Sequence, residues 1–392
     1  MSSPSGSRQY YLDWLRVISI FLVFVYHALR IFGREGFHIN NANAYVAIDN
    51  LSVVLTSVGM PLIFLVAGAS AYFSLNKYTT GRYLKDRALR LLVPFAAGLL
   101  THIPILVYLE RVNHGDFSGS YFDFLPHYFD GLYGFGGNFA WMGLHLWFLL
   151  MLFVYTVISL PLLMALRRGR ILERISQFLA KRGTIYLLAI PIILLSTLLH
   201  PDTFGIRIFG GWNVFNYLLF LLYGFILVSH DGLREQIERG RWVSLALAFG
   251  LLVAGAVLWS GNGEPTFGTS RYSPFFTVHS VGAWCGLLAI WGFSIRHLNF
   301  GTLGLYLANE AVLPFYVLHQ SVLIIVGYFV VQWAIPDWLK FAVIFVGSLA
   351  MIGGLYWFLI RPFNVMRFLF GMRPRATNTQ PLPATPKPGV TT

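Results

Sequence analysis

The stretch YYLDWLRVISIFLVFVYHALRIF, Tyr10 to Phe32, is long and apolar enough to cross a bilayer, yet it contains an arginine and a histidine. Eleven positions separate Arg16 from His27, which on an α-helix is three turns with only ~20° left over and a rise of ~16 Å. Both side chains therefore share one helix face. A charge inside hydrocarbon costs on the order of 2.5–3.5 kcal/mol, so this face indicates a protein-lined or watery interior with a function.

The composition of the whole chain agrees with this first stretch. Of 392 residues, 56% are hydrophobic and 11% are charged, against about 25% charged residues in ordinary soluble domains. The 38 glycines and the 17% aromatic content are typical of the helix contacts and interfacial belts of membrane bundles. The single Cys285 lies in an apolar run, which excludes a disulfide framework or a thiolate metal cluster.

Apolar runs that can cross a ~30 Å hydrocarbon core predict an all-α fold, a polytopic transmembrane helical bundle of about ten spans. The run 303–333 is too long for one span. Because a proline removes a backbone hydrogen bond, Pro314 with Glu310 predicts a bend or break, or a short cytoplasmic helix before a span from about 312. The runs lie near 11–33, 49–75, 88–109, 143–166, 185–200, 212–230, 242–260, 275–295, 303–333 and 338–361.

Lysine and arginine gather in alternate connecting segments, and the positive-inside rule then predicts that both termini are cytoplasmic. This distribution also explains the net charge of +12 through anionic lipid head groups, without nucleic acid. We expect a short cytoplasmic N-terminus over 1–9, a membrane domain over 10–365 and a disordered, Pro- and Thr-rich cytoplasmic tail over 366–392. No cleavable signal peptide is expected, because the first apolar run is too long and contains Arg16.

His27 is the strongest candidate for chemistry. An imidazole switches between base and acid near neutral pH and can take a proton from a hydroxyl. The alternative is a histidine satisfied by one neighbouring carbonyl. Asp13 lies three residues before Arg16 and is close enough on a helix to pair with it, either in support of the site or as a structural ion pair.

Arg87 and Arg90 stand one turn apart where the third apolar run leaves the cytoplasm. Two forked guanidinium groups on one face can hold phosphates with paired hydrogen bonds. Anchoring under the positive-inside rule is the alternative, and these two residues alone favour it.

Later runs carry further polar residues. HLWFL places His145 and Trp147 at the outer entrance of the fourth run, where either could be an interfacial residue. FYVLHQ places His319 at a depth similar to that of His27, and Glu310 lies level with Arg16 as a candidate counter-ion.

Other motifs constrain the chemistry further. No HxxxH, HExxH or pair of carboxylates lies on one helix face, so no metal site is indicated, and no GxSxG or P-loop is present. For His279 we favour a structural helix–helix hydrogen bond. The outer segment 110–142 is rich in aromatic, glycine and acidic residues, which suits either sugar binding or an aromatic loop lying on lipid head groups.

Four segments in this order resemble the acyltransferase 3 family of integral-membrane acyltransferases: LDWLR followed by YH, GMPLIFLVAGAS, RALRLLVP and FYVLHQ. The resemblance covers about residues 10–365, and the HLWFL segment with the short loops is similar to the branch of periplasmic glucan succinyltransferases. It implies transfer of an acyl group from cytoplasmic acyl-CoA to a hydroxyl, usually on a carbohydrate, at the outer face.

The resemblance also implies roles for individual residues. His27 matches the catalytic histidine, Arg16 matches its partner, which would orient the thioester or stabilise developing charge, and Arg87 with Arg90 matches the donor-binding pair. The remaining candidates are polar or aromatic groups expected near this site: for catalysis Asp13 and His319, and for substrate binding His145, Trp147 and Glu310.

We therefore expect a multi-pass enzyme of a bacterial inner or plasma membrane, with acyl-CoA as donor and a carbohydrate or glycolipid as acceptor. The acyl group is acetyl, succinyl or similar, no cofactor is permanently bound, and direct transfer and an acyl-histidine intermediate both stay open. The alternative class is a proton-coupled transporter or flippase of a sugar or lipid-linked substrate that uses the same histidines and Glu310 as a relay.

Overall fold

The computed structural model describes residues 8–207, 210–259 and 265–375. Helices dominate these residues, and the one β-bridge among them joins Leu132 and Phe139, so the predicted all-α fold is confirmed. In chain order the elements are α1 (Tyr10–Arg30), α2 (Val46–Lys77), α3 (Thr80–Leu100), α4 (Ile103–His114), α5 (Tyr121–His127), η1 (Leu144–Leu146), α6 (Trp147–Arg168), α7 (Ile171–Leu179), η2 (Thr184–Leu188), α8 (Ala189–Leu198), α9 (Val214–Leu227), α10 (Asp231–Trp259), α11 (Tyr272–His297), α12 (Leu303–Val330), α13 (Asp337–Gly354), η3 (Leu355–Ile360) and α14 (Asn364–Leu369).

The helices make this chain a multi-pass membrane protein. Six are long and apolar enough to cross a membrane alone, and three further pairs qualify together but bend by more than 40° at a short break. The described residues thus hold six to nine candidate spans, and the predicted count of about ten is not confirmed. The reason is length: α8 has 10 residues and α9 has 14, or ~15 and ~21 Å, which is short of a ~30 Å core.

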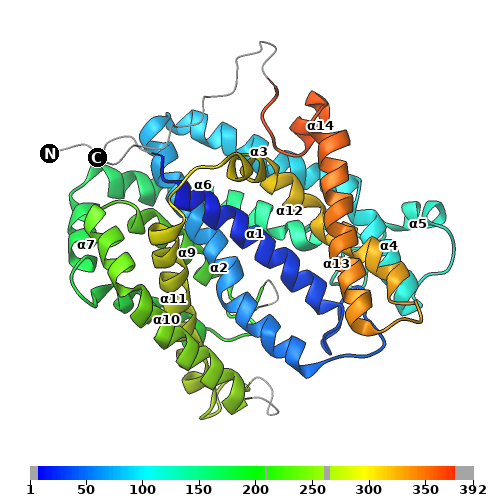
Figure 1. The fold of residues 1–392 in the computed structure, drawn as a ribbon, viewed down its shortest axis with the longest axis horizontal. Helices are drawn as coiled ribbons and strands as arrows, with labels where there is room; N and C mark the ends of the chain where they lie inside the picture. The colour runs from blue at the N-terminus through cyan, green and yellow to red at the C-terminus, as the bar shows by residue number, and fades with distance from the viewer. Residues whose placement is uncertain (1–7, 208–209, 260–264, 376–392) are drawn as a thin grey trace, which may run out of the picture.

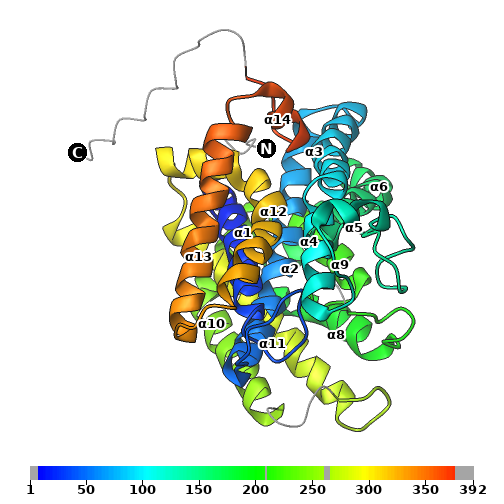
Figure 2. The same cartoon turned by 90° about the vertical axis from the view of Figure 1, so that its right-hand side faces the viewer.

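Helix α1 lies at the centre of the bundle and contacts α2, α11, α12 and α13 (Figure 1). Its buried side chains recur every three or four positions, which is the period of a helix packed on several sides. In the turned view, α14 and α3 lie at the top and the loop between α1 and α2 lies near the bottom (Figure 2). We refer to these as the α14 end and the loop end.

Two glycines allow α2 and α9 to cross at close range. A Cβ atom on Gly68 would lie 1.9 Å from the carbonyl oxygen of Leu221, and one on Gly224 would lie 1.8 Å from that of Leu65. Small residues at such crossings let helix backbones approach, as is common in membrane bundles. This crossing fixes α2, which forms one wall of the candidate site.

Helix α12 differs from the sequence prediction. It runs unbroken from Leu303 to Val330 through Pro314, so the expected break is wrong. Membrane helices tolerate proline because neighbouring groups and local adjustments satisfy the backbone oxygen that loses its partner.

The C-terminal boundary also differs. Helix α14 spans Asn364–Leu369, and Arg367 is 6% exposed and pairs with Glu310, so the folded part continues past the expected boundary at 366. Residues 376–392 of the expected tail, and residues 1–7 of the expected N-terminal segment, lie outside the described residues.

The α2–α9 crossing gives a first prediction. Gly224→Ala should lower the thermal unfolding temperature of the detergent-solubilised protein clearly, because the new methyl group overlaps a backbone oxygen and overpacking costs roughly 1–3 kcal/mol or more. Gly353→Ala is the matched control, since nothing lies within 4 Å of its Cβ position. Equal unfolding temperatures for the two variants would contradict the close crossing.

Candidate functional site

Three histidines from separate elements meet inside the bundle. The ring centroids of His27 on α1 and His319 on α12 are 5.0 Å apart, and His145 on η1 is also 5.0 Å from His319. His102, between α3 and α4, continues the row at 6.1 Å from His145. His319 and His145 are at most 5% exposed, so the row is a polar path through an apolar core.

The carbonyl groups around these rings assign their neutral tautomers. His27 Nδ1 lies 2.8 Å from the carbonyl oxygen of Val23, and His319 Nδ1 contacts that of Tyr316, so both Nδ1 atoms carry hydrogen and donate. His319 Nε2 is then an acceptor, 3.3 Å from His27 Nδ1. It follows that the Nε2 atom of His27 carries a free lone pair and is the basic atom of this ring.

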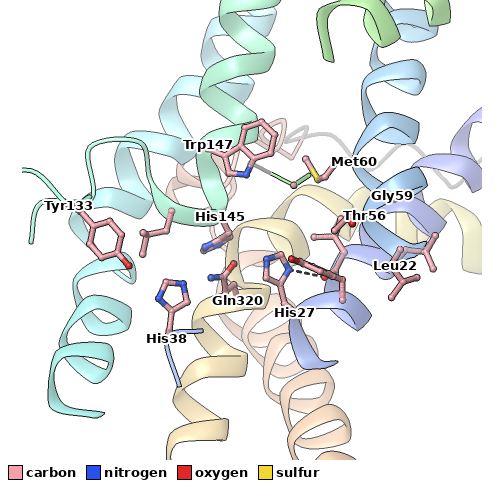
Figure 3. Close-up of a pocket in the computed structure, with 15 residues that line it drawn as sticks. Leu22, His27, His38, Thr56, Gly59, Met60, Tyr133, His145, Trp147 and Gln320 are labelled. Carbon is pink, nitrogen blue, oxygen red and sulfur yellow. Dashed lines mark hydrogen bonds between the residues drawn. The ribbon is translucent and has the colours of Figure 1, made fainter. Parts of the chain in front are cut away.

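His27 faces a cavity of about 270 Å³ (Figure 3). His145 and Trp147 were expected at the outer entrance of their span; instead they are 5% and 8% exposed and line this cavity. The Oε1 atom of Gln320 and the Nδ1 atom of His145 are buried and have no hydrogen-bond partner among the described residues. A buried acceptor without a partner is costly, so the cavity is built for a ligand or water that donates hydrogen bonds.

A third imidazole faces the cavity from the loop after α1. His38 contacts the carboxylate of Glu110 on α4 through Nδ1, and the hydroxyl of Tyr133 donates to both Glu110 oxygens at 2.9 Å. Burial, followed by the Glu110 carboxylate, raises the pKa of Tyr133 above its usual range, so this phenol stays a donor. These three residues were missed by the sequence analysis, because only tertiary packing brings positions 38, 110 and 133 together.

The outer segment 110–142 contributes less to this cavity than expected. Of its residues, only Tyr133 lines the cavity. Asp123 accepts hydrogen bonds from the hydroxyl and backbone N–H of Ser120, the N-cap of α5, and these bonds lower the pKa of Asp123. Asp130 pairs with His127. These acids are therefore engaged in local structure.

Arg16 is held at the junction of three helices. Its Nη1 donates to Asn309 Oδ1 of α12 at 2.9 Å and to Asp13 at 3.3 Å, and its Nη2 donates to Ser70 of α2 at 2.9 Å. The predicted pairing of Asp13 with Arg16 is confirmed. Asn309 also donates to Asp13 at 3.0 Å, which closes the network.

Glu310 does not serve as the counter-ion of Arg16, and that expectation is wrong. Its carboxylate lies 2.9 Å from Arg367 and 3.6 Å from Arg361. Adjacent helix positions differ by about 100°, so the turn of α12 that directs Asn309 towards α1 directs Glu310 towards α14.

Arg87 and Arg90 belong to a cluster of cations at the α14 end. Arg90 Nε donates to the carbonyl oxygen of Gly371 at 3.3 Å, and the Arg87 guanidinium lies 5.3 Å from the centre of the Tyr83 ring. Both interact electrostatically with Arg16, and Arg90 also with Arg373. Four arginines thus concentrate positive charge on one side of the histidine row.

Outside this site, His279 has a structural partner. The His279 ring and the Ser57 hydroxyl form a hydrogen bond of 2.8 Å between α11 and α2, as predicted. Within residues 8–207, 210–259 and 265–375, no three histidine, cysteine, aspartate or glutamate side chains are grouped to hold a metal ion.

The fold and site define a multi-pass membrane protein with a buried base and a separate cluster of arginines. A family model for an acyltransferase domain matches residues 9–358. The chain therefore belongs to the acyltransferase 3 family, as predicted, and it is an acyltransferase for groups other than amino-acyl groups.

Curated relatives agree with the predicted branch. Glucans biosynthesis protein C of Escherichia coli O139:H28 (strain E24377A / ETEC) is 25% identical to this chain over 95% of the chain and 97% of the relative. The protein of the same name from Escherichia coli strain K12 is 24% identical over the same shares. No solved structure matches the chain significantly.

The histidine pair gives a second prediction. His319→Phe should lower acyl transfer at least about tenfold, because losing the partner that orients a catalytic histidine can cost up to ~10⁴ in rate. His319→Gln should keep more activity, since its amide oxygen can still accept from His27 Nδ1–H. Transfer of labelled acyl groups per folded protein measures both, with the exposed His114→Phe as control. Equal losses in the Phe and Gln variants would contradict the assigned tautomers.

Proposed function

We propose that this chain moves an acyl group, such as acetyl or succinyl, from cytoplasmic acyl-CoA to a hydroxyl of a carbohydrate or glycolipid at the outer face of a bacterial inner or plasma membrane. The observation that carries the proposal is the lone pair of His27 Nε2 beside a cavity with unpartnered acceptor atoms, with an arginine cluster towards the opposite end. The glucan-related name of the relatives supports a carbohydrate acceptor.

The donor is proposed to bind at the α14 end. Arg87 and Arg90 would hold the phosphates of CoA, because guanidinium groups pair with phosphate oxygens through two parallel hydrogen bonds. Arg16 uses three of its five N–H groups on Asp13, Asn309 and Ser70, which leaves Nε–H and one Nη2–H for carbonyl groups of the CoA arm. The thioester then lies nearer to His27.

At the loop end, His27 acts as the general base. The acceptor hydroxyl loses its proton to His27 Nε2 as its oxygen attacks the thioester carbonyl. The C–S bond then breaks, and the proton passes from Nε2 to the CoA sulfur. Gln320 Oε1 and His145 Nδ1 offer free acceptor atoms to the hydroxyl groups of the acceptor.

His38 lines the same cavity as His27. It interacts electrostatically with His27, so a charge on one imidazole opposes a charge on the other. Acylation of His27 Nε2 before transfer is the other route, and rapid quenching with labelled acyl-CoA separates the two, because only that route leaves label on the protein.

The topology proposed with this function places both termini in the cytoplasm. The distribution of lysine and arginine supports it. In this topology the cationic cluster at the α14 end would face the compartment from which CoA arrives. The transporter alternative has no support from the family match.

Removing the base tests the proposal directly. His27→Ala should lower acyl transfer by about 10²–10⁴, the usual contribution of a general base, while the exposed His297→Ala should transfer normally. Membranes with equal amounts of each variant receive radiolabelled succinyl-CoA or acetyl-CoA and a glucan acceptor. Undiminished transfer by well-folded His27→Ala would refute the assignment.

The affinity for acyl-CoA tests the role proposed for Arg87 and Arg90. Arg87→Gln and Arg90→Gln should each weaken acyl-CoA binding about tenfold or more, because a hydrogen bond between charged groups contributes about 1.5–3 kcal/mol. The effect should appear in KM for acyl-CoA and not in KM for the acceptor. Arg82→Gln, on the same helix but over the Tyr78 ring, is the control. A rise confined to the KM of the acceptor would place the donor elsewhere.

A further inference from the structure

A second cavity, of about 630 Å³, adjoins the first at the loop end. Tyr26, Thr56 and Gly210 line both cavities and form the neck between them. The walls of the second cavity come from the end of α1, the first turns of α2 and α11, and the last turns of α10. It therefore lies beyond His27 on the side away from the arginine cluster.

Its polar rim includes two ion pairs. Arg34 binds Asp49 through both Nε and the backbone N–H, at 2.9 and 3.0 Å, and Arg30 pairs with Glu35. A carboxylate has about four lone-pair positions, so the Asp49 carboxylate keeps acceptor capacity for hydroxyl donors. Each acid is matched by an arginine, and the third arginine of the lining, Arg207, donates to the Tyr272 hydroxyl and the Ser196 carbonyl, so the rim disfavours a cationic ligand.

Two buried groups in this cavity lack partners. Trp212 is 2% exposed and Ser52 is 6% exposed, and neither the indole N–H nor the hydroxyl has a hydrogen-bond partner among the described residues. Buried polar groups normally have hydrogen-bond partners. The two groups therefore indicate a bound molecule that accepts a hydrogen bond from the Trp212 indole N–H and forms another with the Ser52 hydroxyl. A hydroxyl group can do both, since it donates and accepts.

The remaining wall is aromatic and aliphatic. The Trp212 ring lies 4.9 Å from the His279 ring, and Phe275 and Phe276 of α11 line the same space with Leu251 and Leu252 of α10. Large flat rings beside hydroxyl-binding groups suit a ligand with both apolar C–H faces and hydroxyl edges. A sugar ring has this character.

We propose that the second cavity is a binding subsite for an oligosaccharide, which holds the sugar units next to the unit acylated at His27. The proposal rests on the proposed function. The acceptor chain passes the neck at Thr56 and Gly210, so one unit reaches the 270 Å³ cavity while its neighbours occupy the larger one. The enzyme then selects an oligosaccharide over a single sugar.

Direct binding provides the test, because it does not depend on catalysis. A short linear glucan oligosaccharide is titrated into the full chain in lipid nanodiscs without any acyl donor, and the dissociation constant is measured by calorimetry. Trp212→Phe and Ser52→Ala should each weaken binding about three- to tenfold, the effect of one lost hydrogen bond. The exposed Trp338→Phe is the control and should bind as the wild type does.

Transfer assays then separate this inference from the proposed function. The ratio of kcat/KM for the oligosaccharide to that for glucose should fall in Trp212→Phe and Ser52→Ala by the same factor as binding. No binding by the wild type, or unchanged binding in both variants, would overturn the subsite. Binding that responds to the variants without any acyl transfer would support the subsite and overturn the proposed function.

Discussion

The structure depends on one constraint: polar groups inside an apolar bundle must find their partners within the protein. The Nδ1–H of His27 has hydrogen-bond partners in the carbonyl group of Val23 and the ring of His319. The guanidinium group of Arg16 is hydrogen-bonded to Asp13, Asn309 and Ser70. Each solution requires α12 to lie beside α1. The central position of α1 and its contacts with α2, α12 and α13 therefore serve Arg16 and His27 as much as its apolar residues.

This arrangement separates two kinds of chemistry by depth. Cations gather at the α14 end, where Arg90 reaches Gly371, while the histidine row and the unpartnered acceptor atoms lie towards the loop end. Under the proposed function, these two regions suit a phosphate and a sugar, which need different surroundings. The helical core separates the α14 end from the loop end within a single chain. The family match indicates that this separation serves acyl transfer.

Relations set by the helical period could be predicted from the sequence. Arg16, His27 and Asp13 were placed correctly relative to one another, because spacing along one helix determines which face they share. Contacts between helices were harder to predict: Asn309 takes the place expected for Glu310, and His145 meets His319 although 174 positions separate them. Packing between helices and loop conformation decide such contacts, and neither leaves a periodic signal in the sequence.

Helices α1 and α12 run parallel and are joined at two levels, by Arg16 with Asn309 and by His27 with His319. The two contacts are 11 residues apart on α1 and 10 on α12, or ~16 Å along the axis. Helices joined at two levels cannot slide past each other by a turn without breaking both contacts. Under the proposed function, these two contacts fix the distance between the arginine cluster and His27. This distance sets how far the thioester must extend from its bound phosphates, and the thioester of a donor with a shorter arm would not reach His27.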